Sequence, residues 1–199
     1  MKLVLFLFGL IFSLGVYAQG RFIELRPAVR DDDNGKALGG AIIEVYKGGS
    51  LFASETSAAS GKVKPIELPV CIGCTYTIKI KKSGYVTKTA IVDGHTDYPE
   101  EMPPGAVTQK FEVSIFQSVE GIDFSFLDRE PMVEFAIDAY GIVSFDQDKI
   151  RVMKKKIDDL KRKMEEQKEK LEQEAAEKEK MEADFNAYVA AGDAAMKQQ

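Results

Sequence analysis

The feature that most constrains this chain is a change of sequence pattern near Asp146. From Asp146 to Gln199 there is no proline and a single glycine, Gly192, and Lys, Glu, Ala, Met and Leu dominate. Proline and glycine destabilise a helix interior most, so this composition favours one long helix, with Asp146 or Ser144 as its N-terminal cap. At about 1.5 Å per residue, roughly 45 residues form a rod nearly 70 Å long. The pattern therefore predicts a long helix over residues 146–199, joined to a different kind of structure before it.

A heptad repeat of apolar residues runs along this segment. With Ile150 as the first a position, nine of the twelve a and d positions through Tyr188 are apolar. The nine are Ile150, Met153, Ile157, Leu160, Met164, Leu171, Met181, Phe185 and Tyr188. Such a repeat is typical of a coiled coil, here with a polar interruption in its middle. We expect these residues to form the seam through which the helix contacts another protein.

Charge is divided unequally along the same segment. Eight Lys or Arg and two Asp between Lys149 and Lys163 give +6, whereas four Lys and nine acidic residues between Met164 and Asp184 give −5. A parallel pair of such helices would bring like charges together, and an antiparallel pair would align the basic half with the acidic half. The partner is therefore expected to be a second copy in an antiparallel homodimer, or an unidentified protein of matching charge order. The alternative is a solvated helix stabilised by its own i,i+4 ion pairs.

Before the helix, from Phe22 to about Phe145, apolar and polar residues alternate over short segments. Ile42, Val45 and Tyr46 lie in one β-rich run. The alternating sets are Ile66 and Leu68; Tyr76, Ile78 and Ile80; Phe111, Val113 and Ile115; and Val133, Phe135 and Ile137. A period of two indicates half-buried strands, and Gly, Pro, Asn and Asp clusters separate them. The fold class predicted is mainly β with an α tail: a small antiparallel β-sandwich, further strands over 120–145, and one long C-terminal helix.

Three motifs in the β part resemble those of one domain family. Residues 35–46 read GKALGGAIIEVY, a turn followed by a β run; residues 56–63 read TSAASGKV at the place of a hairpin turn; and residues 76–85 read YTIKIKKSGY. Together they resemble a carboxypeptidase regulatory-like domain over about Arg21–Val119, although the hairpin lacks the usual Asp and aromatic residue. The resemblance implies a transthyretin-like, Ig-like β-sandwich, common in Bacteroidota cell-envelope proteins. It implies an interaction module without catalytic residues.

The first 18 residues have the pattern of a secretory signal peptide. Lys2 precedes an apolar run from Leu3 to Gly15, and Ala18 supplies a small residue at the exit. The alternative, a membrane anchor, is disfavoured because the run is shorter than the roughly 18 residues that span a bilayer. We therefore expect an exported protein of the periplasm or cell envelope of a Gram-negative bacterium, without a transmembrane span after cleavage. The predicted divisions are a signal peptide over 1–18, the β-sandwich over 19–119, a strand extension or linker over 120–145, and a long, charged, coiled-coil-like helix over 146–199.

The cysteines form a Cys-x-x-Cys pair, Cys71 and Cys74, in β context. A redox-active pair needs its first cysteine at a helix N-terminus, and a zinc site needs a second ligand pair. A structural disulfide is expected, because exported proteins meet an oxidising environment; redox activity and free thiols are the alternatives.

Other candidate sites are weak. Asp31–Gly35 has the acidic residues of a cation loop but lacks a distal Glu, since position 42 is Ile42. His95, between Asp93 and Asp97, is the only histidine, and the chain has no G-x-S-x-G elbow to partner it in a hydrolase. We expect no catalytic residues, no metal and no cofactor.

The composition excludes some function classes and leaves two open. With 27 Lys and Arg against 32 Asp and Glu, the net charge of −5 argues against nucleic-acid binding. The function predicted is a non-enzymatic envelope scaffold or protein-interaction module acting through the sandwich and the helix. The alternative is a carbohydrate- or peptide-binding accessory module, which needs a concave aromatic face, with Tyr85, Tyr98 and Phe116 as candidates.

Overall fold

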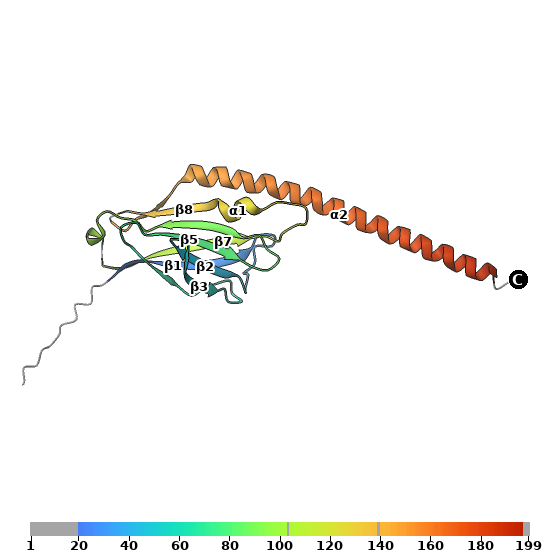
Figure 1. The fold of residues 1–199 in the computed structure, drawn as a ribbon, viewed down its shortest axis with the longest axis horizontal. Coiled ribbons are helices and arrows are strands. Elements are labelled where there is room, and N and C mark those ends of the chain that lie inside the picture. The colour runs from blue at the N-terminus through green and yellow to red at the C-terminus, as the bar shows by residue number, and fades with distance from the viewer. Residues whose placement is uncertain (1–19, 103, 139, 197–199) are drawn as a thin grey trace, which may run out of the picture.

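The computed structural model describes residues 20–102, 104–138 and 140–196, which form two β-sheets packed face to face with a long helix along one flank (Figure 1). The three-stranded sheet has the order β4-β1-β7, and the six-stranded sheet has the order β3-β2-β5-β6-β8-β9. The strands are β1 Arg21–Asp31, β2 Ile42–Lys47, β3 Ser50–Thr56, β4 Ile66–Pro69, β5 Thr75–Lys81, β6 Lys88–Asp93, β7 Gly105–Ile115, β8 Pro131–Ile137 and β9 Val143–Phe145. The helices are η1 Pro99–Glu101, α1 Ser125–Arg129 and α2 Gln147–Met196. The predicted mainly-β sandwich with a long C-terminal helix is confirmed.

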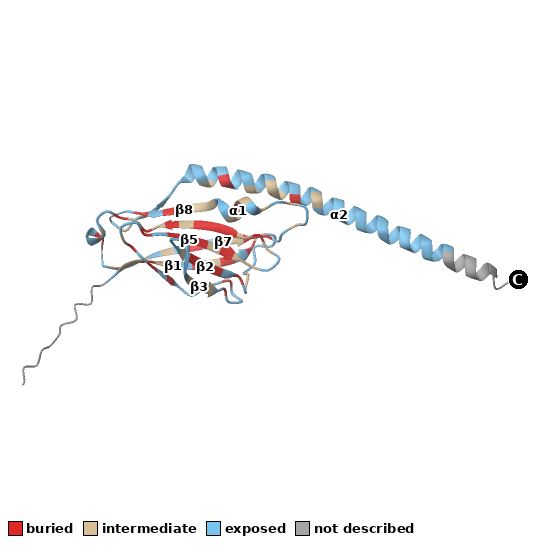
Figure 2. Cartoon of the chain, viewed as in Figure 1, coloured by how far each residue is buried: buried red, intermediate tan, exposed pale blue. Residues whose placement is uncertain are grey.

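The hydrophobic core lies between the two sheets, where Figure 2 shows most of the buried residues. The alternating residues predicted to face inward on β5, Tyr76, Ile78 and Ile80, are fully buried. Phe111, Val113 and Ile115 on β7 are buried against them in the same cluster. Burial of one such side chain contributes about 1.5–3 kcal/mol, so the alternation alone supplies much of the driving force for the sandwich.

Two strand pairs differ from the expected antiparallel arrangement. β1 and β7 run parallel over their full length, from Arg21 beside Gly105 to Asp31 beside Ile115, and β6 and β8 are also parallel. Parallel neighbours require a long crossover connection. Here β1 and β7 are separated by β2 to β6, and β6 and β8 by η1, β7 and α1. Alternation is identical for both strand directions, so the sequence pattern could not distinguish them.

Residues 120–145, predicted as a strand extension or linker, complete the sandwich. β8 and β9 add the last two strands to the six-stranded sheet. Phe135 on β8 packs edge-on against Phe111 of the opposite sheet, with ring centroids 5.5 Å apart. Strands β8 and β9 therefore belong to the same sandwich as the strands that precede them.

Tight turns and caps place these elements. The two-residue β2–β3 hairpin turn uses Gly48 and Gly49 at φ of 55° and 80°, a conformation that hairpins of this type require. A side chain at Gly61 would lie 2.4 Å from the backbone oxygen of Val29, so only glycine fits there. Helix α2 begins after Asp146, whose Oδ1 accepts hydrogen bonds from the backbone N–H groups of Asp148 and Lys149 at 2.9 and 3.1 Å. Of the two caps considered, Asp146 is therefore the one in place.

Candidate functional site

Helix α2 covers an open flank of the sandwich. β7 ends the three-stranded sheet and β8–β9 end the six-stranded sheet, so the sandwich is open between them. The first turns of α2 lie over this opening, and Met153 and Met164 are buried at 7% and 4% exposure. They belong to a second apolar cluster with Val86, Phe116 and Leu127. The helix is therefore part of the folded body over this length.

Ion pairs add to this apolar packing. Lys149 Nζ lies 2.6 Å from a Glu134 carboxylate oxygen on β8, and Lys156 Nζ lies 2.6 Å from one of Glu130. Lys161 pairs with Asp32, which follows β1. Exposed ion pairs contribute only about 0–1 kcal/mol each, so their main effect is to set the rotation and register of the helix.

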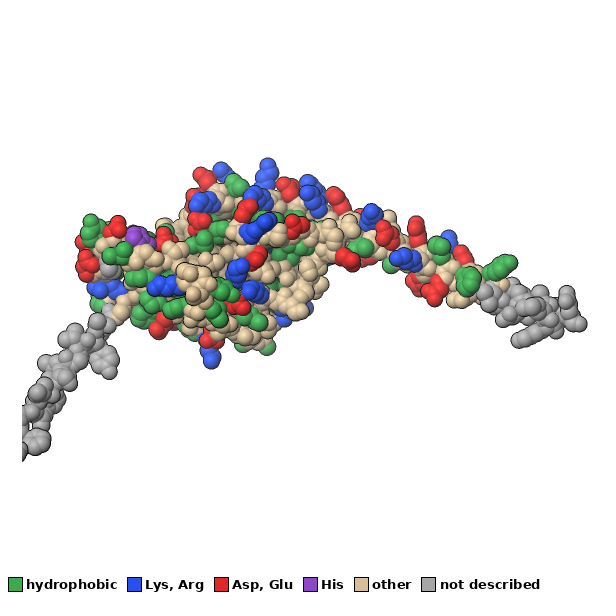
Figure 3. Space-filling view, in the orientation of Figure 1, with side chains coloured by type: hydrophobic (Ala, Val, Ile, Leu, Met, Phe, Trp, Pro, Cys, Tyr) green, Lys and Arg blue, Asp and Glu red, His purple; other side chains and the backbone are tan. Residues whose placement is uncertain are grey.

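Beyond this docked segment, α2 extends past the sandwich (Figure 1). Every residue from Lys168 to Tyr188 is exposed, as the continuous pale blue in Figure 2 shows. Four of these residues are large and apolar: Leu171, Met181, Phe185 and Tyr188, at 37%, 72%, 65% and 80% exposure. Hydrophobic side chains stand out among charged ones on this outer part of the helix in Figure 3. We call residues 168–188 the free segment of α2 and residues 147–164 the docked segment.

The structure divides the predicted nine-residue seam between these segments. The residues Ile150, Met153, Ile157, Leu160 and Met164 are buried or half-buried against the sandwich of the same chain. The other four remain exposed on the free segment. An interchain seam over the whole length from Ile150 to Tyr188 would therefore have to displace α2 from its own sandwich.

A groove of about 540 Å³ remains between α2 and the open flank. Much of its wall area is apolar. The apolar side chains include Phe111 on β7, Phe135 on β8 and Met153 on α2. One buried cation, Lys88, lies at the groove, together with Lys161. Half of the residues that line this open groove are apolar and half are charged or polar, and its volume lies in the range of small-molecule sites.

Lys88 is 5% exposed. It shares the inward face of β6 with Ala90 and Val92, and its Nζ donates a hydrogen bond of 2.6 Å to the backbone oxygen of Ser114. Nζ also lies 4.9 Å from the centroid of the Phe116 ring. Burial lowers the pKa of Lys88 to about 8; the Asp32 carboxylate opposes this shift and the Lys161 ammonium adds to it.

Sequence reasoning missed Lys88 and the groove. The available signal was positional, because Lys88 is two residues before Ala90 and four before Val92 and so falls on the inward face of a strand. A lysine on such a face is rarely fully buried without a role for its charge.

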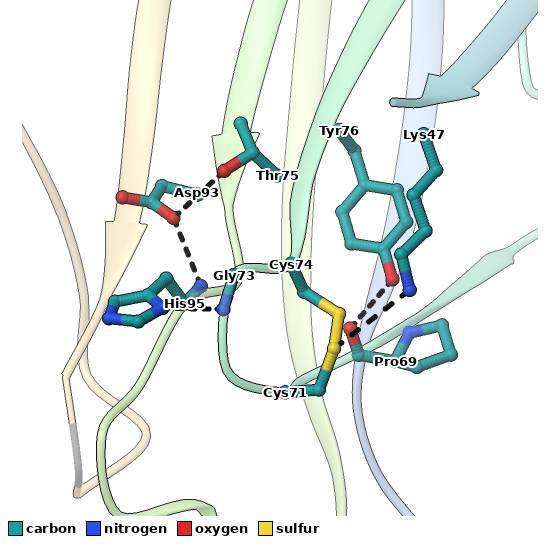
Figure 4. Close-up of a disulfide and its surroundings, with 9 residues drawn as sticks. All are labelled: Lys47, Pro69, Cys71, Gly73, Cys74, Thr75, Tyr76, Asp93 and His95. Atoms are coloured by element: carbon teal, nitrogen blue, oxygen red, sulfur yellow. Dashed lines mark hydrogen bonds between the residues drawn. A yellow bond between two sulfur atoms is a disulfide. The ribbon is translucent and has the colours of Figure 1, made fainter. Parts of the chain in front are cut away.

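The predicted cysteine pair lies at the other end of the sandwich, where the structure joins Cys71 to Cys74 (Figure 4). The pair lies in the loop between β4 and β5, with Cys74 fully buried and its Cα 5.2 Å from that of Cys71. The backbone N–H of Gly73 donates to His95 Nδ1 at 2.6 Å, and the Tyr76 hydroxyl donates to the backbone oxygen of Pro69 at 2.7 Å. The disulfide therefore lies where hydrogen bonds join the β4–β5 loop to the loop that follows β6.

The arrangement of His95 does not resemble a catalytic dyad with a nucleophile. Nδ1 accepts from Gly73, and Nε2 lies 3.1 Å from Asp97 Oδ1. Both ring nitrogens are thus engaged in structural contacts.

Among residues 20–102, 104–138 and 140–196, no three or more His, Cys, Asp or Glu side chains are grouped to hold a metal ion. Within the Asp31–Gly35 loop, one carboxylate oxygen of Asp31 accepts a hydrogen bond from the Asp33 N–H, and the other accepts one from the Tyr85 hydroxyl.

The three aromatic candidates for a concave binding face are not brought together. Phe116 is fully buried and Tyr98 is 56% exposed. Tyr85 precedes the start of β6 and Tyr98 follows its end, so the two lie at opposite ends of that strand. The predicted aromatic face is therefore not present at these residues.

The predicted signal peptide, residues 1–18, lies outside the described residues. In the part of the chain that the structure describes, no helix is both long enough and apolar enough to cross a bilayer.

No known protein family matches this chain, and no curated protein does. Several solved structures are similar to part of this chain, at low TM-scores. Group B streptococcus pilus 2b backbone protein is 19% identical, with a TM-score of 0.33 over 49% of this chain and 42% of that protein. Chlorocatechol 1,2-dioxygenase from Pseudomonas putida is 14% identical, with a TM-score of 0.34 over 52% and 63%. Klebsiella pneumoniae 5-hydroxyisourate hydrolase is 10% identical, with a TM-score of 0.31 over 62% and 99%. Two of these proteins are enzymes, but such partial similarity assigns no activity to this chain.

Proposed function

We propose that this protein is a non-enzymatic, exported scaffold that presents the free segment of α2 to a protein partner in the cell envelope. The observation that carries the proposal is the line of exposed apolar residues on a helix that projects past its own domain. The resemblance to carboxypeptidase regulatory-like domains of Bacteroidota envelope proteins supports the same kind of role for the sandwich.

The exposed residues have the spacing of a contact surface. Met181, Phe185 and Tyr188 follow one another at i, i+4 and i+7, so they lie on one face of the helix. An isolated polar helix is only marginally stable in water, because most helical stability in proteins comes from packing of an apolar face. A partner that covers these three side chains would supply that packing.

The charge of the free segment constrains the partner. Residues 168–188 carry four Lys and seven acidic residues, a net charge of −3. Two free segments paired with each other would bring acidic surfaces together. The predicted antiparallel homodimer instead needs the basic half of each helix, whose apolar edge is packed on its own sandwich. A heterotypic partner with a basic, apolar-striped helix therefore fits better than a second copy.

Site-specific photocrosslinking in the native envelope tests this proposal. A probe at Phe185 on the free segment is expected to give one dominant product, identified by mass spectrometry. The matched control is a probe at Val152, an apolar residue of the docked segment that is also exposed, at 57%. The combined substitution Met181→Gln and Tyr188→Gln should abolish the Phe185 product. Equal products from both probe sites would contradict the proposal, and a product of twice the chain mass would identify a homodimer.

A further inference from the structure

We propose that the groove between α2 and the open flank of the sandwich binds a single-chain fatty carboxylate. This inference is independent of the partner of the free segment. It rests on the shape of the groove, the chemistry of its walls and an excess of positive charge at one place in it.

The volume and walls fit a hydrocarbon chain. The groove measures about 540 Å³, and ligand sites typically measure roughly 300–1,000 Å³. Phe111 and Phe135 reach it from the two opposing sheets, and Met153 and Ile157 reach it from α2. An acyl chain lying there would be removed from water on all of these sides, which is favourable in proportion to the apolar area covered.

The charges around the buried Lys88 do not balance. Lys88 and Lys161 both lie over the ring of Phe116, with Nζ 4.9 and 5.9 Å from its centroid. Asp32 is the carboxylate that faces them, and it forms an ion pair with Lys161. Because Asp32 is paired with Lys161, which is partly exposed, Lys88 is the buried cation without a carboxylate of its own, in a place where solvent screens its charge poorly.

The remaining charged residues of the groove cancel one another. They are exposed and comprise two cations and two anions: Lys110, Lys154, Glu112 and Asp158. The four lysines and three acidic residues that line the groove therefore give a net charge of +1, and Lys88 is the buried one of these charged residues. A monoanionic head group beside Lys88 would neutralise it, whereas an uncharged amphiphile would leave Lys88 without a counter-ion. The geometry points to a carboxylate placed at Lys88, with its chain along the groove.

The first test titrates the full chain, labelled with ¹³C at its methionine methyl groups, with dodecanoate below its micelle concentration. Resonances of Met132 and Met153, which line the groove, should shift saturably, and that of Met181 on the free segment should not. Dodecanol, with the same chain but no charge, should bind about tenfold more weakly or worse, since it lacks the charge-assisted contact. Shifts confined to Met181, or equal affinity for the alcohol, would overturn the proposal.

Variants then separate the head site from the chain site. Lys88→Met keeps the volume and removes the charge, so dodecanoate affinity should fall about tenfold or more while dodecanol affinity stays unchanged. Val133→Phe adds bulk to the groove wall and should weaken both ligands. The control is Lys155→Met, an exposed lysine of α2 that faces away from the groove, with no effect expected. Wild-type affinity for dodecanoate in both Lys88→Met and Val133→Phe would place the ligand elsewhere and refute the assignment.

Discussion

The docked and free segments of α2 belong to one continuous helix, yet their surroundings differ in every respect. The docked segment is basic and lies on a flank that offers the carboxylates of Glu134, Glu130 and Asp32. The free segment is acidic and extends past the sandwich. Cations near the N-terminus of a helix and anions near its C-terminus interact unfavourably with the helix dipole. The sandwich of the same chain therefore explains the basic half, whereas, among the residues that the structure describes, it offers no surface that covers the acidic half.

The largest expected difference between the segments concerns their apolar residues. Met164→Ala should lower the free energy of unfolding by about 2–5 kcal/mol, because Met164 is 4% exposed and its removal leaves a cavity. The same substitution at Met181, 72% exposed, should change it by less than about 0.5 kcal/mol. Urea denaturation measures both. Hydrogen exchange shows whether the loss at Met164 takes the form of local undocking, with reduced protection of amides 150–164. Equal effects at the two methionines would mean that the docked segment is not packed as described.

A heptad repeat alone could not have revealed this difference. Ile150, Met153 and Ile157 satisfy the a and d pattern as well as Met181 and Phe185 do. The pattern reports that one side of the helix is apolar, and it holds whether that side meets another helix or a sheet of the same chain. The strands β5 and β7 were predicted correctly because an alternating segment has one possible inner face. The parallel pairing of β1 with β7 and the burial of Lys88 depend on contacts between residues far apart in the sequence, which no local period encodes.

The second prediction compares a lysine beneath the docked segment with one on the outer surface of α2. The folded-state pKa of Lys88 is about 8, below the value of 10.5 for an unperturbed lysine. Between these two values the unfolded chain binds more protons than the folded chain, so stability rises with pH in this window. Below about pH 8 both states carry the proton, and the folded state bears the full cost of the buried charge.

The size of this effect follows from the difference of 2.5 pKa units, from 10.5 to about 8. At 1.36 kcal/mol per unit, the stability of the wild type relative to Lys88→Met should rise by about 3 kcal/mol between pH 7.5 and 10.5. Lys155→Met, at an exposed position of α2, is the control over the same range. Denaturation midpoints at a series of pH values measure both curves. A flat difference for Lys88→Met would show that its ammonium is not buried.

The third prediction concerns the end of the sandwich that carries the disulfide. In the loop-entropy description, a ring of four residues contributes about 2 kcal/mol. The double substitution Cys71→Ser and Cys74→Ser should therefore lower the free energy of unfolding by about that amount. It should leave hydrogen-exchange protection of the docked segment unchanged, because both cysteines form backbone hydrogen bonds with Gly94, which follows β6, and neither lines the groove beneath α2. Loss of protection in α2 would indicate coupling between the two ends of the sandwich.

The smallest expected effect is that of the ion pairs, and it decides what holds α2 in place. Lys156 and Glu130 are both 48% exposed at their side chains, so solvent screens their attraction. A double-mutant cycle with Lys156→Gln and Glu130→Gln should give a coupling of about 0.5 kcal/mol that falls as salt is added. The matched control is the pair Arg151 and Asp148 on the solvent side of the helix, at 81% and 82% exposure, which should give less.

Because these couplings are small beside the apolar packing of Met153 and Met164, α2 should stay docked in about 1 M salt, where the Debye length is roughly 3 Å. Hydrogen-exchange protection at residues 150–164 measures docking directly under these conditions. High salt strengthens apolar contacts while it weakens ionic ones, so the two contributions respond in opposite directions. Release of the helix by salt would show that Lys149, Lys156 and Lys161 hold it, and the basic half would then be free to pair with the acidic half of a second copy.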